Sequence, residues 1–276
     1  MRISVRGLTF DVSQTGPDMA DPEDVPVLLL HGFPQNASMW DQVTPVLHAN
    51  GRSTIAPDQR GYSSGARPSD VDAYAMPECV ADAVAILDEL DVPVVDLVGH
   101  DWGAIVGWHL AAKHPERVNT YTAVSVPHPV AFGQALADDE DQKRRSAYFG
   151  LFRQAGHAED VLLEDHAARI TAMFAGCPTE RIEEFVAPMR DRATLTGALN
   201  WYRAMTPATM TCPAVSVPIT FVWGEGDPAI GAAAARSCGA HVEGDYRFVP
   251  LGGVSHWVTE EAPGALTEAI LARIEG

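Results

Sequence analysis

Residues 97–104 read Leu-Val-Gly-His-Asp-Trp-Gly-Ala, and this stretch decides the fold of the chain. An apolar strand leads into it, a glycine-flanked turn follows, and the next residues are typical of a helix. A strand that passes directly into a helix is the repeating unit of an α/β sheet, which places its functional residues at the carboxyl ends of the strands. Asp101, between the two glycines, therefore lies at a position where such a sheet carries functional residues.

Other short apolar runs alternate with helical patterns along the chain, as expected for parallel strands joined by crossover helices. Residues 1–10 also alternate like a strand. The sequence therefore predicts an α/β protein with a mostly parallel, doubly wound sheet. The predicted strands are Val27–Leu30, Ser53–Ala56, Val94–Val98, Thr120–Val124 and Ile219–Trp223, and the predicted helices are Pro77–Leu90 and Ala104–His114.

The alternation of strands and helices stops between about Pro129 and Pro213. This stretch is rich in Ala, Arg, Glu and Asp and has helical periodicity without a convincing strand. We therefore expect residues 1–129 and 213–276 to form an α/β core, and residues 130–212 to form an inserted helical cap, or lid, over the strand ends.

Composition narrows the function. The 276 residues suffice for one α/β core with an insertion, and the net charge of −18 argues against nucleic-acid and anionic-membrane partners. No apolar run reaches the ~18 residues of a membrane span, and no signal-peptide pattern opens the chain. Four scattered cysteines suggest neither a metal site nor a disulfide. We expect a cytoplasmic protein, and its preference for arginine over lysine favours a bacterial origin.

Asp101 occupies a turn of the form Gly-x-Asp-x-Gly. With serine in the middle, this turn is the nucleophile elbow of acyl transfer. A carboxylate instead attacks saturated carbon that carries a good or strained leaving group, and forms an alkyl-enzyme ester. A helix N-cap is the alternative role for Asp101, but it does not explain glycines on both sides. The pattern predicts a nucleophile for ring-opening or halide-displacing hydrolysis.

Candidates for the remaining catalytic roles follow in order along the chain. Asp227 comes just after a predicted strand, and His256 lies in a glycine-bounded loop before the last helix. The order nucleophile, acid, histidine is that of α/β hydrolases. We expect Asp227 to orient His256, and His256 to activate the water that cleaves the ester. Glu225 is the lesser candidate for the acid.

Two backbone N–H groups are candidates for an oxyanion hole. Phe33 lies in the sequence His31-Gly-Phe-Pro34 after an apolar strand, and Trp102 follows the nucleophile. In this arrangement both N–H groups would hold the oxygen of Asp101 as the ester carbon becomes tetrahedral.

Across nearly its full length the sequence resembles the epoxide hydrolases of the α/β-hydrolase fold. The resemblance rests on residues 31–34, 58–65 and 99–103 together with Asp227 and His256. One position departs from it, because Gly65 stands where the family's glycine turn usually ends in Ser or Thr.

The resemblance extends into the predicted cap. The segments Tyr148-Phe-Gly-Leu-Phe-Arg153 and Leu199-Asn-Trp-Tyr202-Arg203 are similar to those that carry the family's paired tyrosines. This implies that Tyr148 and Tyr202 donate hydrogen bonds to an epoxide oxygen. It also implies a small apolar epoxide and water as reactants, with no metal or organic cofactor; a homodimer is left open. We further expect Phe152, Trp40 and Trp201 to line the substrate pocket.

Haloalkane dehalogenases are the main alternative, since they share the Asp nucleophile and the Asp/His pair. Halide departure needs N–H donors and no proton transfer. Trp102 offers one donor, and Trp40 or Trp201 could supply a second, because Phe33 has no side-chain donor. A more distant alternative is a non-catalytic hydrolase-fold protein that binds small molecules.

Overall fold

The computed structural model of the chain describes residues 1–17 and 25–276. Its strands form one eight-stranded sheet in the order β1-β2-β4-β3-β5-β6-β7-β8. The strands from β4 to β8 are parallel, while β2 is antiparallel to both β1 and β4. The bounds are β1 Arg2–Val5, β2 Leu8–Thr15, β3 Val27–Leu30, β4 Thr54–Pro57, β5 Val95–His100, β6 Val118–Val124, β7 Ile219–Gly224 and β8 Tyr246–Leu251.

The N-terminal residues form a hairpin, β1–β2, where the sequence predicted one strand. Its turn lies at Arg6 and Gly7, whose φ angles are +52° and +75°. A two-residue turn with left-handed backbone at both positions matches the right-handed twist of its strands. Glycine takes this conformation at little cost, which explains why the strand pattern breaks there.

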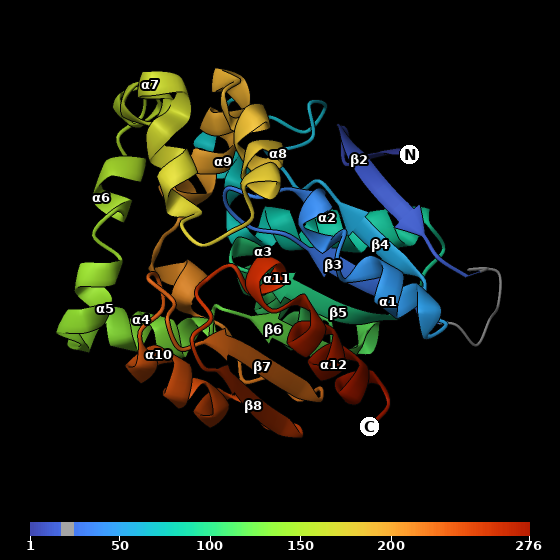
Figure 1. Cartoon of the computed structure of the whole chain (residues 1–276). Helices are drawn as coiled ribbons and strands as arrows, with labels where there is room; N and C mark the ends of the chain where they lie inside the picture. Colours follow the sequence, from blue (N-terminus) through green and yellow to red (C-terminus); the bar gives the residue numbers. More distant parts are fainter. Residues whose placement is uncertain (18–24) are drawn as a thin grey trace.

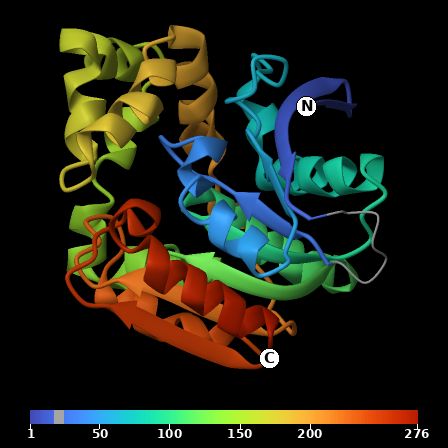
Figure 2. The ribbon, with the colours of Figure 1, turned by 45° about the vertical axis from the view of Figure 1, so that its right-hand side comes forward.

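Helices cover both faces of the sheet, with α12 on one face and α2 and α3 on the other (Figures 1 and 2). Strands β3, β4, β5 and β7 are buried along their whole length. Continuous burial is typical of parallel strands between two helical layers. The helices of this part are α1 Thr44–Ala49, α2 Met76–Glu89, α3 Trp102–Lys113, α10 Ala232–Ser237, α11 Val258–Glu261 and α12 Pro263–Ile274.

A helical insertion separates β6 from β7, and α6 to α9 stand together above the carboxyl ends of the strands (Figure 1). The division at residues 130–212 stays a prediction. The helices of the insertion are α4 Pro129–Asp138, α5 Glu140–Arg145, α6 Phe149–Phe152, α7 His157–Met173, α8 Thr179–Met189 and α9 Arg192–Ala204. Helix α7 consists of two pieces, because its backbone is non-helical at residues 164–167. No helix in the described part of the chain is long and apolar enough to cross a bilayer.

Candidate active site

Asp101 lies in the sharp turn between β5 and α3, with φ +52° and ψ −119°. This backbone conformation is unfavourable for a non-glycine residue and costs about 1–3 kcal/mol. The glycines beside it let β5, α3 and β3 approach closely. A Cβ atom on Gly99 would lie 2.4 Å from the Gly103 carbonyl oxygen, and one on Gly103 would lie 2.1 Å from that of Leu30. The sequence pattern therefore reflects the geometry that presents the Asp101 side chain.

The Asp101 carboxylate contacts hydrogen-bond donors through both of its oxygens. Its Oδ1 accepts the N–H of Phe33 at 2.7 Å, and the N–H of Trp102 also donates to the carboxylate. Its Oδ2 lies 3.5 Å from Nε2 of His256. Burial alone would raise the pKa of Asp101, but the hydrogen bond and charge of His256 outweigh it and lower that pKa. The carboxylate is therefore ionised at neutral pH.

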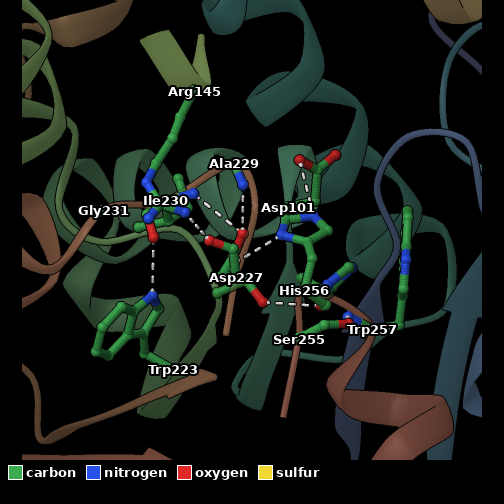
Figure 3. Close-up of polar contacts among 12 residues, drawn as sticks. Asp101, Arg145, Trp223, Asp227, Ala229, Ile230, Gly231, Ser255, His256 and Trp257 are labelled. Atoms are coloured by element: carbon green, nitrogen blue, oxygen red, sulfur yellow. Dashed lines mark hydrogen bonds and ion pairs between the residues drawn. The ribbon is translucent and has the colours of Figure 1, made fainter. Parts of the chain in front are cut away.

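His256 bridges the two acids of the site (Figure 3). Its Nδ1 lies 2.8 Å from Oδ2 of Asp227, which is fully buried. Burial lowers the pKa of His256, but the charge of Asp227 and the hydrogen bond to Asp101 outweigh it and raise that pKa to about 10. In the resting site the imidazole is thus a cation between two carboxylates.

The backbone of His256 is held by two buried groups that sequence reasoning did not assign to the site. Nε2–H of His100 donates to the His256 carbonyl at 2.9 Å, and the hydroxyl of Ser125 donates to the same oxygen at 3.1 Å. Burial lowers the pKa of His100 to about 4, so its imidazole stays neutral beside the His256 cation. His100 stands inside the elbow motif and Ser125 just after β6, but no local pattern shows that either meets His256, because the contact forms only through the folded sheet.

A cavity of about 580 Å³ opens onto Asp101 and His256. Tyr148, at the start of α6, and Tyr202, on α9, both line it, and their ring centroids lie 6.0 Å apart. Burial, with the charge of Asp101 in addition, raises the pKa of each phenol above its usual value. Both hydroxyls therefore keep their protons at neutral pH and can donate them in hydrogen bonds.

The Trp102 side chain forms a hydrogen bond with Tyr202. Because an indole N–H can only donate, the Tyr202 hydroxyl is the acceptor and keeps its own hydrogen for another partner. Its ring also packs edge-on against Phe33, at a centroid distance of 5.4 Å. Tyr148 and Tyr202, the hydrogen-bond donors predicted from the sequence, thus line the same cavity as the Asp101 carboxylate.

Of the three residues expected to line the pocket, Phe152 does so, whereas Trp40 and Trp201 lie elsewhere. Trp40 ends the short helix η1, Ala37–Trp40, and lines a separate groove beside α1. The Trp201 indole donates to the Arg60 carbonyl at 2.8 Å and points into the core. These two residues were expected because their indole N–H groups could act as donors in the pocket, but helix phase decides which face of a segment reaches the cavity.

Several cavity residues were not predicted. Trp257 follows His256, and Met173 ends α7; the Trp257 indole donates to the Met173 carbonyl at 2.8 Å and joins these two walls. Arg145, on α5, contributes a charged group to the wall. Small residues add to it, and none of them was singled out by the sequence: Ala172, Ala175, Gly226, Pro228, Ala229 and Ser255.

The fold and the site together define a hydrolase of the α/β class, with an elbow after β5, an acid after β7 and a histidine after β8. A family model described as the alpha/beta hydrolase fold matches residues 25–263, and the chain belongs to this family. The fold class predicted from the sequence is confirmed.

Within this family the chain is similar to epoxide hydrolases, as its sequence predicted. Epoxide hydrolase A of Mycobacterium tuberculosis is 29% identical, with 99% of this chain and 96% of the relative covered. Epoxide hydrolase 3 of Siraitia grosvenorii is 30% identical, with 95% and 93% covered. The crystal structure of Epoxide Hydrolase A from Mycobacterium thermoresistibile shares 27% identity and superposes with a TM-score of 0.86, covering 100% of this chain and 98% of the other.

Proposed function

We propose that this protein is an epoxide hydrolase that forms a vicinal diol through an alkyl-enzyme ester on Asp101. The observation that carries the proposal is one cavity that collects an ionised carboxylate, a His–Asp pair and two protonated phenols. The names of the relatives support the reaction class. Most of the cavity wall is aromatic or aliphatic, which suits a small apolar epoxide. In this proposal the helices of residues 130–212 are the cap.

Ring opening uses the carboxylate and the phenols together. Tyr148 and Tyr202 hydrogen-bond the ring oxygen, and Asp101 attacks a ring carbon from the opposite side. The carbon–oxygen bond of the ring breaks as the bond to Asp101 forms, and one phenol transfers its proton to the developing alkoxide. The Trp102 hydrogen bond to Tyr202 stabilises the tyrosinate that results.

Ester hydrolysis then uses His256. Esterification removes the negative charge of Asp101, which in the resting site holds a proton on the imidazole, so the pKa of His256 falls. The imidazolium then gives its proton to the tyrosinate, and the neutral His256 becomes a competent base. It takes a proton from the water that attacks the ester carbon, while the N–H groups of Phe33 and Trp102 hold the oxyanion. Collapse releases the diol oxygen, which takes the proton back from His256.

The protons balance over the two steps. Cleavage leaves Asp101 as a carboxylic acid beside a neutral His256, and transfer of this proton to the imidazole restores the resting carboxylate and imidazolium. The tyrosinate has already regained its proton before hydrolysis. The sum is epoxide plus water to diol. Asp227 stays ionised throughout and stabilises the imidazolium whenever it forms.

The rival dehalogenase reaction lacks its second donor in this geometry. The Trp201 indole is bound to a core carbonyl, and Trp40 lies off the cavity. The Trp102 indole is engaged by Tyr202. The hydroxyl donors that do face the cavity suit a leaving oxygen that needs a proton.

A substrate panel tests the proposed function. Purified protein is given aryl and alkyl epoxides and, in parallel, chloro- and bromoalkanes, with diol measured by chromatography and halide by electrode. We expect diol from at least one epoxide, no halide release, and no diol with the Asp101→Asn variant. Halide release without diol formation would contradict the proposal.

A further inference from the structure

The carboxylate of Asp227 owes its orientation to the backbone that follows it, residues 227–231, here called the acid loop. Its Oδ1 accepts the N–H groups of Ala229 at 2.7 Å and Ile230 at 3.0 Å, which leaves Oδ2 to face His256 (Figure 3). A displacement of the acid loop would therefore rotate the carboxylate away from His256. The contacts that hold the acid loop in place therefore also maintain the hydrogen bond between Asp227 and His256.

Helix α5 of the insertion holds the acid loop through two side chains. Gln142 is fully buried; its Nε2 donates to the Ala229 carbonyl at 2.8 Å, and its Oε1 accepts the Gly231 N–H at 2.8 Å. Arg145 donates through Nη1 to the carbonyl of Asp227 itself. Residues three apart on a helix share a face, so both side chains reach the loop from one side.

The contact between α5 and the acid loop is close. A Cβ atom on Gly231 would lie 3.2 Å from Oδ2 of Asp141 and 3.3 Å from Oε1 of Gln142, so a larger residue there would press on the helix. The arginine is fixed in turn, because its Nε donates to Asp141 Oδ2 at 2.7 Å. Asp139 caps the helix by accepting the Asp141 N–H at 2.7 Å. Helix α5 is thus held in a fixed position against the acid loop.

We propose that Gln142 and Arg145 are positioning residues for ester hydrolysis, which act by holding the acid loop and thereby Asp227. The inference rests on the proposed function. Tyr148 lies three residues beyond Arg145, so one short segment carries a phenol for ring opening and orders the acid for hydrolysis. When this segment packs on the core, it positions the groups needed for both ring opening and ester hydrolysis.

The kinetic test separates the two half-reactions. Wild type and Gln142→Met are mixed with styrene oxide, quenched at millisecond times, and the ester on the Asp101 peptide is followed by mass spectrometry. The variant leaves the Ala229 carbonyl and the Gly231 N–H without their partner. We expect ester hydrolysis to slow about tenfold or more while ester formation stays within twofold. Ester then accumulates, and kcat and KM fall together.

A matched control variant tests whether the effect is specific to Gln142, and a second variant tests the other contact between α5 and the acid loop. Gln154→Met removes the same side chain from an exposed position in the insertion, where, among the described residues, its amide donates to the Gly150 carbonyl alone. We expect it to behave as wild type. Arg145→Met changes a partly exposed residue and should slow hydrolysis in the same direction as Gln142→Met. Equal slowing of both half-reactions, or unchanged hydrolysis in both loop variants, would overturn the proposal.

Two further measurements show whether Gln142 acts through Asp227. Combined with Asp227→Asn, the Gln142→Met change should slow hydrolysis by less than twofold more, because the group it positions is already altered. Without any substrate, an NMR titration should give a lower pKa for His256 in Gln142→Met than in Gln154→Met, because the Asp227 carboxylate that raises this pKa is displaced. Asp101 and His100, which also face His256, are unchanged in both variants. An unchanged pKa of His256 would refute the positioning role, whether or not the protein hydrolyses any epoxide tested. Failure to hydrolyse every epoxide tested would count against the proposed function alone.

Discussion

Replacing Asp101 with asparagine should turn His256 from a cation into a neutral base, as esterification does in the proposed reaction. The two side chains have nearly the same shape, and an amide oxygen can still accept the Phe33 N–H. The negative charge 3.5 Å from Nε2 of His256 is lost. The variant therefore copies the charge state of the alkyl-enzyme without its substrate.

The expected size follows from Coulomb's law. Unit charges about 4 Å apart at an effective dielectric constant of about 20 interact by about 4 kcal/mol, and each pKa unit corresponds to about 1.4 kcal/mol. The pKa of His256, raised to about 10 in the resting site, should therefore fall in Asp101→Asn to roughly 7 or 8. Asp227 still pairs with Nδ1 and keeps that pKa above the ordinary value.

The assay is an NMR pH titration of protein labelled with ¹⁵N at histidine, with a His256→Gln sample to identify the resonance. Unfolding gives a second reading. A folded-state pKa of about 10 above an unfolded value of about 6.5 contributes stability that is fully present below pH 6.5 and is lost as pH rises toward 10. Wild type should thus lose more stability than Asp101→Asn between pH 8 and 10. A His256 pKa equal in both proteins would refute the reasoning.

Other substitutions test three separate parts of the structure. Tyr148→Phe and Tyr202→Phe should each slow ester formation about tenfold or more, and the double variant about a hundredfold or more, in rapid-quench experiments. Retained ring opening in the double variant would exclude phenol catalysis. Arg203→Met leaves the buried Glu159 carboxylate without its 2.8 Å partner and should lower the free energy of unfolding by about 3–5 kcal/mol in urea titrations. Gly103→Ala places a methyl group 2.1 Å from a β3 carbonyl oxygen, so it should yield little folded protein, and a Tm near that of wild type would contradict the elbow geometry.

The sequence predicted the central strands well because they are buried on both faces and appear as uninterrupted apolar runs. It did not predict β8, Tyr246–Leu251, which lies at the sheet edge, is only partly buried and contains Pro250. An edge strand tolerates both features, and neither gives a periodic signal.

The nucleophile, acid and histidine could be found because each lies in a loop whose glycines reflect a tight turn. Gln142 could not, because nothing in a short polar helix shows that one amide is buried against a loop 87 positions away along the chain. Trp40 and Trp201 were expected in the pocket as indole donors that lie near the motifs in the sequence, but the fold places them outside it. Aromatic residues near the motifs are abundant, and tertiary packing alone decides which of them face the cavity.

The central claim is that Asp101 forms the ester, and one turnover in water labelled with ¹⁸O tests it most directly. Enzyme in excess over styrene oxide is allowed to react once, and both the diol and the peptide that contains Asp101 are analysed by mass spectrometry. We expect the label in the Asp101 carboxylate and an unlabelled diol, because water attacks the ester carbon. A labelled diol with an unlabelled Asp101 would mean direct attack of water on the epoxide and would contradict the account.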